Sequence, residues 1–186
     1  RVVAPLGMLQ QLTFGVGSVS EASAPASGAG FVFVRQTGGF PQLYAYSGPG
    51  AVRPLTQGRY QHGSPVWAHD GRQVAFYGTD RTGVNDDIYI VNVAAGTPPR
   101  LAIAGAAGSW RPLDWSQDDS KLLLLNTLSP QQSALYVAEV ATGALTPVAV
   151  PESRITAASF APDGVGFYLI SNAQSDFEQL LYYNPI

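Results

Sequence analysis

Short apolar runs separated by turn residues dominate the stretch from Ser64 to Leu101. Ser64–Trp67 and Gln73–Tyr77 flank Asp70-Gly71, and an Asp-Gly pair between two apolar runs predicts a β-hairpin because glycine tolerates positive φ. Two more apolar runs follow a polar loop, at Ile88–Val93 and Arg100–Ile103. The pattern predicts four antiparallel strands in one twisted meander, which needs neighbouring copies to bury both of its faces.

The same pattern recurs along the chain. An aromatic residue stands three positions before a turn pair at Trp67, Trp115 and Phe160, and a worn copy of this corner lies at Ala24–Gly28. A second anchor, an aliphatic residue followed by tyrosine, recurs at Leu43-Tyr44, Ile88-Tyr89, Leu135-Tyr136 and Leu181-Tyr182. Both anchors repeat at about 45 residues, a length that is typical of a four-stranded β-propeller blade.

The sequence therefore predicts an all-β fold, a single β-propeller domain of four-stranded antiparallel blades with about four blades over residues 1–186. The expected blades cover residues 21–57, 64–103, 112–150 and 156–183, and residues 8–14 are expected to form an orphan outer strand. The last blade ends one strand short, so the orphan strand is a candidate to close a four-bladed ring. The alternative, which we favour, is that the chain forms part of a larger ring.

Composition excludes several classes of function. The chain has a net charge of −3 and a single lysine, Lys121. Without a basic patch, nucleic acids and anionic membrane surfaces are not expected partners. No apolar run reaches the roughly 18 residues of a membrane span, so membrane insertion is not expected. The absence of cysteine excludes disulfides and thiolate metal sites, and it fits the bacterial periplasm and the cytoplasm equally well.

Several segments resemble known propeller repeats. Ser64–Gly71 (SPVWAHDG), Val74–Phe76 and Asp87–Tyr89 are similar to the repeat of TolB-like propellers and to the N-terminal propeller of bacterial prolyl oligopeptidase-type serine peptidases. Later segments favour the peptidases, namely Gly108–Trp110, Leu113–Ser116, Ser133–Tyr136, Ala141–Gly143 and Ser171–Leu181. In the peptidase family the propeller caps an α/β-hydrolase domain with a Ser-Asp-His triad and limits which peptides reach it.

The catalytic chemistry of that family does not carry over to this chain, because no Gly-x-Ser-x-Gly nucleophile motif occurs in it. The resemblance implies a non-catalytic propeller segment that gates or docks peptide substrates for a hydrolase domain of the parent protein. The alternative is a TolB-like scaffold that binds a protein or peptide partner and has no enzymatic role. Self-association through open blade edges is a further expectation.

Structural roles account for most of the residues that stand out. We expect Trp67, Trp115 and Phe160 to pack between neighbouring blades, and Asp70 and Asp163 to shape turns through bonds to the backbone. The two histidines, His62 and His69, have no obvious carboxylate or serine partner in the sequence. Asp80, Asp86, Asp87 and Arg81 are expected to form a solvated loop with local ion pairs. No catalytic residue, metal ligand or cofactor site is predicted.

One face of the propeller is the better candidate for binding. In an antiparallel meander alternate turns lie on opposite faces, so the second-to-third strand loops and the connections between blades share one face, here called the loop face. These segments are longer and more polar than the turns opposite them, and loops on a rigid scaffold commonly carry binding. The candidate binding residues on the loop face are Arg59, Tyr60, His62, Arg81, Trp110 and Arg111.

Overall fold

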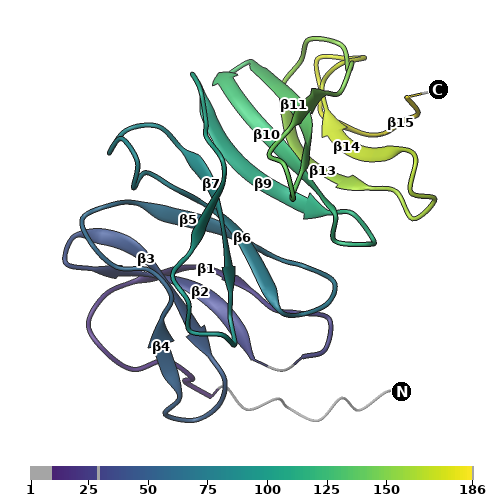
Figure 1. The fold of residues 1–186 in the computed structure, drawn as a ribbon. Helices are drawn as coiled ribbons and strands as arrows, with labels where there is room; N and C mark the ends of the chain where they lie inside the picture. The colour runs from purple at the N-terminus through teal and green to yellow at the C-terminus, as the bar shows by residue number, and fades with distance from the viewer. Residues whose placement is uncertain (1–9, 29, 186) are drawn as a thin grey trace, which may run out of the picture.

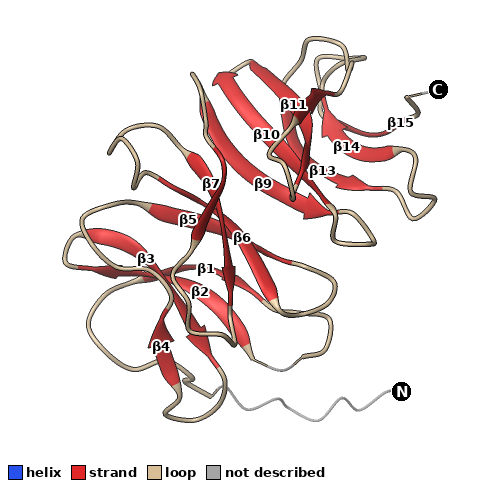
Figure 2. Ribbon diagram, viewed as in Figure 1, coloured by secondary structure: helices blue, strands red, loops and turns tan. Residues whose placement is uncertain are grey.

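The computed structural model describes residues 10–28 and 30–185, and these ranges contain strands β1 to β15 but no helix (Figure 2). The strands of blade one are β1 (Val19–Ser23), β2 (Phe31–Thr37), β3 (Phe40–Tyr46) and β4 (Val52–Pro54). Those of blade two are β5 (His62–Trp67), β6 (Gln73–Gly78), β7 (Asp87–Asn92) and β8 (Arg100–Ile103). Those of blade three are β9 (Ser109–Trp115), β10 (Lys121–Ser129), β11 (Gln132–Glu139) and β12 (Leu145–Pro147). Blade four has three: β13 (Ile155–Phe160), β14 (Phe167–Ser171) and β15 (Gln179–Tyr183).

Each blade is an antiparallel meander in which sequential strands pair with one another. The all-β class and the propeller-type blades are thereby confirmed. The sheets follow one another along an open arc, with the first and last sheets at opposite ends of the molecule (Figure 1). No segment of the described ranges is a helix long and apolar enough to cross a bilayer.

The corner between the first two strands of each blade is built in the same way four times. The backbone carbonyls of Pro25, Ala68, Ser116 and Ala161 accept hydrogen bonds from the N–H groups of Gly28, Gly71, Asp119 and Gly164 at 2.8–3.0 Å. The donor residue has positive φ in all four corners, which glycine tolerates best. The worn sequence copy at Ala24–Gly28 therefore forms the same turn, and Asp119 takes the position that glycine occupies elsewhere.

The core lies between the blades rather than inside any one sheet. Leu122 and Leu124 pack in a cluster shared with blade two, whereas Leu123 and Leu125 pack in a cluster shared with blade four. Successive residues of a strand point to opposite faces of its sheet, so a strand enclosed on both sides is apolar at every position. This explains the continuous Leu122–Leu125 run.

The repeated aromatic residues pack between blades, as predicted. Trp115 is fully buried, and its indole N–H donates to the carbonyl of Val66 in blade two at 3.0 Å. Trp67 repeats this contact one blade earlier by donating to the carbonyl of Ser23 at 2.8 Å. Phe160 packs in the cluster between blades three and four. The turn roles of Asp70 and Asp163 are also confirmed, since each carboxylate accepts backbone N–H bonds within its own corner.

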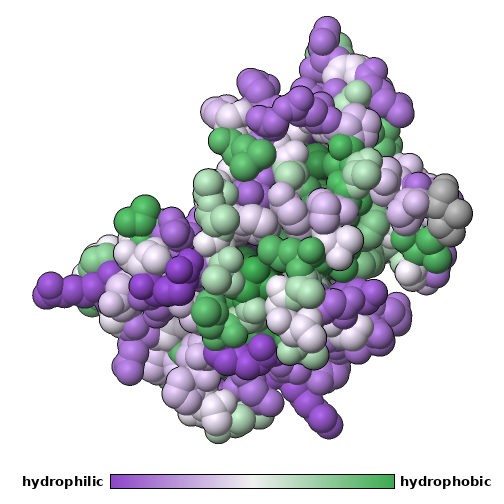
Figure 3. All heavy atoms as spheres, turned by 45° about the horizontal axis from the view of Figure 1, so that its top comes forward, coloured by the Kyte–Doolittle hydropathy of each residue, from purple (hydrophilic) through white to green (hydrophobic). Residues whose placement is uncertain are grey.

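The last blade leaves an apolar face uncovered. Ile170 pairs with Leu180 across β14 and β15 in the way that Leu125 pairs with Leu135 in blade three. Leu135 is fully buried, whereas Leu180 is 73% exposed. Nearby Tyr168 and Tyr182 are exposed as well. Elsewhere apolar side chains reach the surface mainly toward the middle of the face seen in Figure 3, with polar ones at its margins.

The orphan strand expected over residues 8–14 is not found where it can be examined. Gln10–Phe14 form no strand, while Met8 and Leu9 lie outside the described residues. In the described part of the chain, β15 pairs only with β14, so its outer edge is unpaired. The described structure thus shows an open arc of three complete blades and one three-stranded blade.

Candidate functional site

The loop between β6 and β7 is held by an ion pair between the exposed Arg81 and the buried Asp87. The guanidinium of Arg81 donates to both carboxylate oxygens of Asp87, at 2.9 and 2.8 Å. Asp87 is fully buried and also accepts the N–H of Gly105 at 2.8 Å, and Arg81 donates to the Gly105 carbonyl at 3.1 Å. The expectation of a solvated loop is therefore wrong for Asp87, because this pair ties the loop to the connection between blades two and three.

Two of the six predicted binding residues are buried. Trp110 is 4% exposed, lies 4.9 Å from the ring of Tyr136, and donates its indole N–H to the carbonyl of Ala107 at 3.3 Å. His62 is only 2% exposed. Neither side chain offers a surface on the loop face, so both act in the interior of the molecule.

The other four predicted residues are accessible, but they do not form one cluster. Arg59 and Tyr60 are exposed on the connection from blade one to blade two. Arg81 is exposed on the next loop, and Arg111 is half-buried on β9. Arg111 donates to the carbonyl of Thr156 at 3.1 Å, so it also links blades three and four.

Both histidines have carboxylate partners that the sequence did not reveal. Nε2 of His62 lies 2.7 Å from Oδ2 of Asp80, and Nδ1 of His69 lies 3.1 Å from Oδ1 of Asp119. The first pair spans one hairpin, since His62 begins β5 and Asp80 follows the end of β6. The absence of partners read from the sequence is thus corrected. A regular hairpin register around Asp70-Gly71 would not have found the first pair, because a bulge between Gly63 and Val66 shifts His62 by one position.

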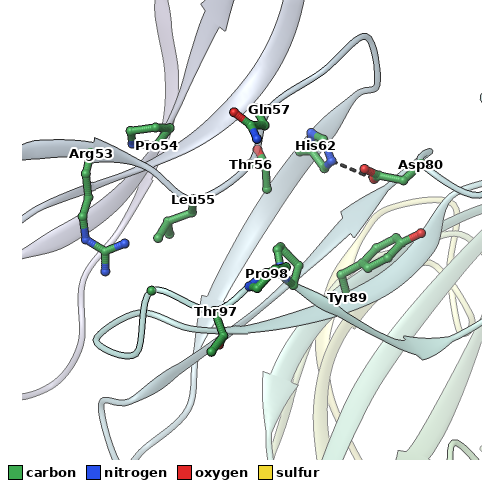
Figure 4. Close-up of a pocket in the computed structure, with 12 residues that line it drawn as sticks. Arg53, Pro54, Leu55, Thr56, Gln57, His62, Asp80, Tyr89, Thr97 and Pro98 are labelled. Carbon is green, nitrogen blue, oxygen red and sulfur yellow. Dashed lines mark hydrogen bonds and ion pairs between the residues drawn. The ribbon is translucent and has the colours of Figure 1, made fainter.

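A groove of about 520 Å³ runs along the boundary between blades one and two (Figure 4). One wall is the segment 53–57 of blade one, and the other wall combines the His62–Asp80 pair, Tyr89 and the 96–99 turn of blade two. Figure 4 shows Arg53 at the opposite end of the groove from Asp80. Desolvation by burial, followed by the negative charges of Asp80 and Asp87, raises the pKa of Tyr89, so its phenol stays neutral near pH 7.

The blade-one wall of the groove is fixed by a buried hydrogen-bond network. Thr56 donates its hydroxyl to the side-chain carbonyl of Gln42 at 2.9 Å and accepts the N–H of Leu43 at 2.9 Å. The amide nitrogen of Gln42 donates to the carbonyls of Gly58 and Tyr60, at 3.3 and 2.8 Å. This network sets the path of the connection that carries Arg59 and Tyr60.

The described part of the chain shows no cluster of side chains that is typical of a metal-binding site. Residues 10–28 and 30–185 contain no group of three or more His, Cys, Asp or Glu side chains that could hold an ion. The carboxylates described above are engaged with backbone N–H groups, arginines or histidines.

Comparisons with known proteins identify the fold. No family model matches the sequence, and no curated protein matches it. The TolB-type protein from Agrobacterium tumefaciens has a similar structure, with a TM-score of 0.68 and 18% identity over 90% of this chain. A puromycin-hydrolyzing peptidase from Mycobacterium tuberculosis matches 95% of this chain with a TM-score of 0.67 and 15% identity. A prolyl endopeptidase matches 91% of it with a TM-score of 0.61 and 16% identity.

The chain spans only part of each of these proteins. It covers 58% of the TolB-type protein and 28% of each peptidase. The structural neighbours thus include both groups that the sequence resembles, and they show a β-propeller fold for almost the whole chain.

Proposed function

We propose that this chain is a non-catalytic segment of a larger β-propeller that gates or docks peptide substrates for a hydrolase domain elsewhere in the parent protein. The observation that carries the proposal is the uncovered face of blade four. The pairs Val34–Leu43, Tyr77–Ile88 and Leu125–Leu135 occupy one repeat position, and in each case the next blade packs against them.

The equivalent pair of blade four has the same apolar chemistry without the cover. Ile170 and Leu180 are 37% and 73% exposed, and the neighbouring tyrosines extend the patch. An exposed apolar patch on a rigid sheet marks an interaction surface, and the position of this one in the repeat is where another blade would pack. The arc is therefore suited to continue into a larger ring. The similar solved structures are longer than this chain, which fits the same interpretation.

The loop face supports the gating role through its accessible polar side chains. Arg59, Tyr60 and Arg81 are exposed there, and arginine and tyrosine side chains bind peptide carbonyls and carboxylates well. No Gly-x-Ser-x-Gly nucleophile motif occurs in this sequence, and the proposal assigns hydrolysis to another part of the parent protein.

A TolB-like scaffold without an enzyme is the second candidate. It is favoured by the larger share of the TolB-type protein that the chain covers. In this case the loop face would bind a protein or peptide partner directly. The two candidates make different predictions about the gene, because only the first requires a hydrolase in the same reading frame.

The decisive experiment is to read the gene on both sides of this segment and then assay the whole protein. A downstream α/β-hydrolase domain, together with peptidase activity, supports the gating role. Arg59→Ala and Tyr60→Ala should then lower kcat/KM for long peptides more than for a small chromogenic substrate. A reading frame that contains only further blades, with no peptidase activity, contradicts the gating role and favours the scaffold.

A further inference from the structure

One repeat position is apolar in blades three and four but is occupied by histidine in blade two. His62, Trp110 and Ile155 each lie five residues before the repeated aromatic position of their blade, and they pair with Gly78, Asn126 and Ser171 of the following strand. All three side chains are buried, with 2%, 4% and 2% exposure. Blades three and four fill the position with apolar side chains, so packing alone does not require an imidazole in blade two.

The imidazole of His62 carries an unmet polar requirement. A carboxylate only accepts hydrogen bonds, so Nε2 donates to Asp80, and the remaining polar atom of the ring is Nδ1. Nδ1 is buried and has no hydrogen-bond partner in the described structure. Such groups are rare in native proteins because each one costs desolvation free energy.

The His62–Asp80 pair is held rigidly in the wall of the groove. The imidazole packs edge-on against the buried ring of Phe76, with the centroids 5.8 Å apart. A Cβ atom at Gly78 would lie 2.8 Å from Oδ2 of Asp80 and 2.9 Å from Cδ2 of His62. Only glycine therefore leaves room for this pair at the end of β6.

Asp80 presents a free acceptor to the groove. Its side chain is 36% exposed, and the only bond found for it within the described residues uses Oδ2. The rest of the lining combines apolar groups, which include the ring of Tyr89 and the prolines Pro54, Pro98 and Pro99, with the polar side chains of Thr56, Gln57 and Thr97. A negative oxygen at one end of a partly apolar groove complements a ligand with a cation on an apolar body.

We propose that the groove between blades one and two binds a primary ammonium group carried on an apolar body, with the ammonium on Asp80 and the body over Tyr89 and the prolines. The volume of about 520 Å³ accommodates a few amino-acid residues. Arg53 at the far end suits an acceptor group of the same ligand, such as a peptide carbonyl (Figure 4). The groove meets the loop face at Gln57, His62 and Asp80, and its existence does not depend on the proposed function.

The direct test is to titrate the whole chain with small probes and to monitor binding by the NMR shifts of its backbone amides. The probes are 2-phenylethylamine, the tripeptide amide Phe-Ala-Ala with a free amino terminus, and acetyl-Lys-Ala-Ala amide. The neutral counterpart is N-acetyl-2-phenylethylamine. We expect saturable shifts at Gly78, Asp80 and Tyr89 with the amines and at least about tenfold weaker binding of the neutral compound. The two peptides distinguish an amino terminus from a lysine side chain as the source of the ammonium.

Variants separate a ligand site from a structural ion pair. Asp80→Asn keeps an acceptor for His62 but removes the charge, and it should weaken amine binding by roughly 10- to 100-fold. Asp176→Asn, an exposed aspartate in the β14–β15 loop, makes the same charge change and should leave binding unaltered. His62→Ile introduces the residue that blade four has at this repeat position, Ile155. This variant should therefore fold, and we expect it to bind the amines more weakly.

Three outcomes overturn the proposal. The first is equal binding of 2-phenylethylamine and its acetylated form. The second is unchanged amine binding in folded Asp80→Asn or His62→Ile. The third is no saturable shift with any amine at ~10 mM, a concentration at which a site with a Kd on the order of 1 mM would be mostly occupied.

Discussion

The carboxylate of Asp119, at the corner of blade three, accepts the backbone N–H of His69, at the corner of blade two, at 2.7 Å. The same carboxylate accepts the N–H of Asp70 at 2.9 Å. Asp119 has φ +57° and replaces the glycine found at this position in the other corners. One residue thus closes its own turn and joins two blades.

Replacing Asp119 separates these two roles. Asp119→Gly keeps the turn but removes the bonds to blade two, and it should lower the free energy of unfolding by about 1–2 kcal/mol. Asp119→Ala removes the same bonds and keeps a Cβ in the left-handed region, as Asp119 itself does, so it should be about 1 kcal/mol less stable than Asp119→Gly. Urea denaturation measures both. An Asp119→Ala variant as stable as the wild type would show that the contact between corners contributes nothing.

Trp115 should be the most sensitive of the repeated aromatic positions. Trp115→Ala leaves a large cavity at the boundary of blades two and three, so we expect a loss of about 3–5 kcal/mol. Trp115→Phe keeps most of the apolar area but leaves the Val66 carbonyl without its donor, and it should lose about 1–3 kcal/mol. Chemical denaturation compares them, and equal losses for the two variants would contradict a role for the indole N–H.

A matched pair of leucines tests whether another blade covers blade four. Leu135→Ala should destabilise this chain by about 2–5 kcal/mol because the side chain is buried by blade four. Leu180→Ala, at the equivalent position of the β14–β15 ladder, should change its stability by no more than about 0.5 kcal/mol. In the parent protein we expect both substitutions to be costly.

The exposed face around Leu180 also predicts how this chain behaves in solution. Leu180→Asp should reduce self-association in sedimentation experiments, because it places a charge in an apolar surface. If Leu180→Ala is as mild in the parent protein as in this chain, no further blade packs on β14 and β15.

Asp118 should give stability a dependence on pH in the acid range. Hydrogen bonds from the hydroxyls of Ser116 and Ser120 lower the pKa of Asp118 from 3.8 to about 2. Because the folded-state pKa is the lower one, the contribution is complete above about pH 4 and is lost as the pH falls toward 2. The difference in unfolding free energy between wild type and Asp118→Asn should shrink over this range. A constant difference would show that another feature of Asp118 stabilises the corner.

Asp80 should matter more than a loop aspartate normally does. From the sequence alone, Asp80→Ala is expected to stay within about 0.5 kcal/mol. In the structure it leaves the buried imidazole of His62 without a partner on either nitrogen, so we expect a loss of about 1–3 kcal/mol. Asp176→Ala serves as the exposed control, and equal stability of the two variants would exclude a contribution of the His62–Asp80 bond.

The sequence by itself determined the repeat, the strands and the core. Turn corners depend on a few neighbouring residues, which is why Asp70-Gly71 and even the worn copy at Ala24–Gly28 were predictable. The continuous Leu122–Leu125 run identified a strand enclosed by two sheets for the same local reason. The packing of Trp67, Trp115 and Phe160 followed from their recurrence at one position of the repeat.

Only the tertiary structure decided which polar side chains meet. In a regular ladder continued from the Trp67–Val74 pair, His62 would oppose Thr79, but a bulge between Gly63 and Val66 places it opposite Gly78. One extra residue in a strand moves every side chain before it to the other face of the sheet. The bulge therefore turns His62 toward blade one and the groove, whereas a regular strand would put it on the side of Val66.

Tertiary packing also decided the burial of Asp87 and Trp110 and the exposure of Leu180. Asp87 is buried by the connection that follows its own blade, and Trp110 packs against the ring of Tyr136 on β11, two strands away in the same sheet. Although the sequence anchor aligns Leu181 with Leu135, the strand register places Leu180 at the ladder position of Leu135. The side chain is leucine at both ladder positions. Their exposure differs because burial depends on whether a neighbouring blade is present, and that is a property of the assembled arc.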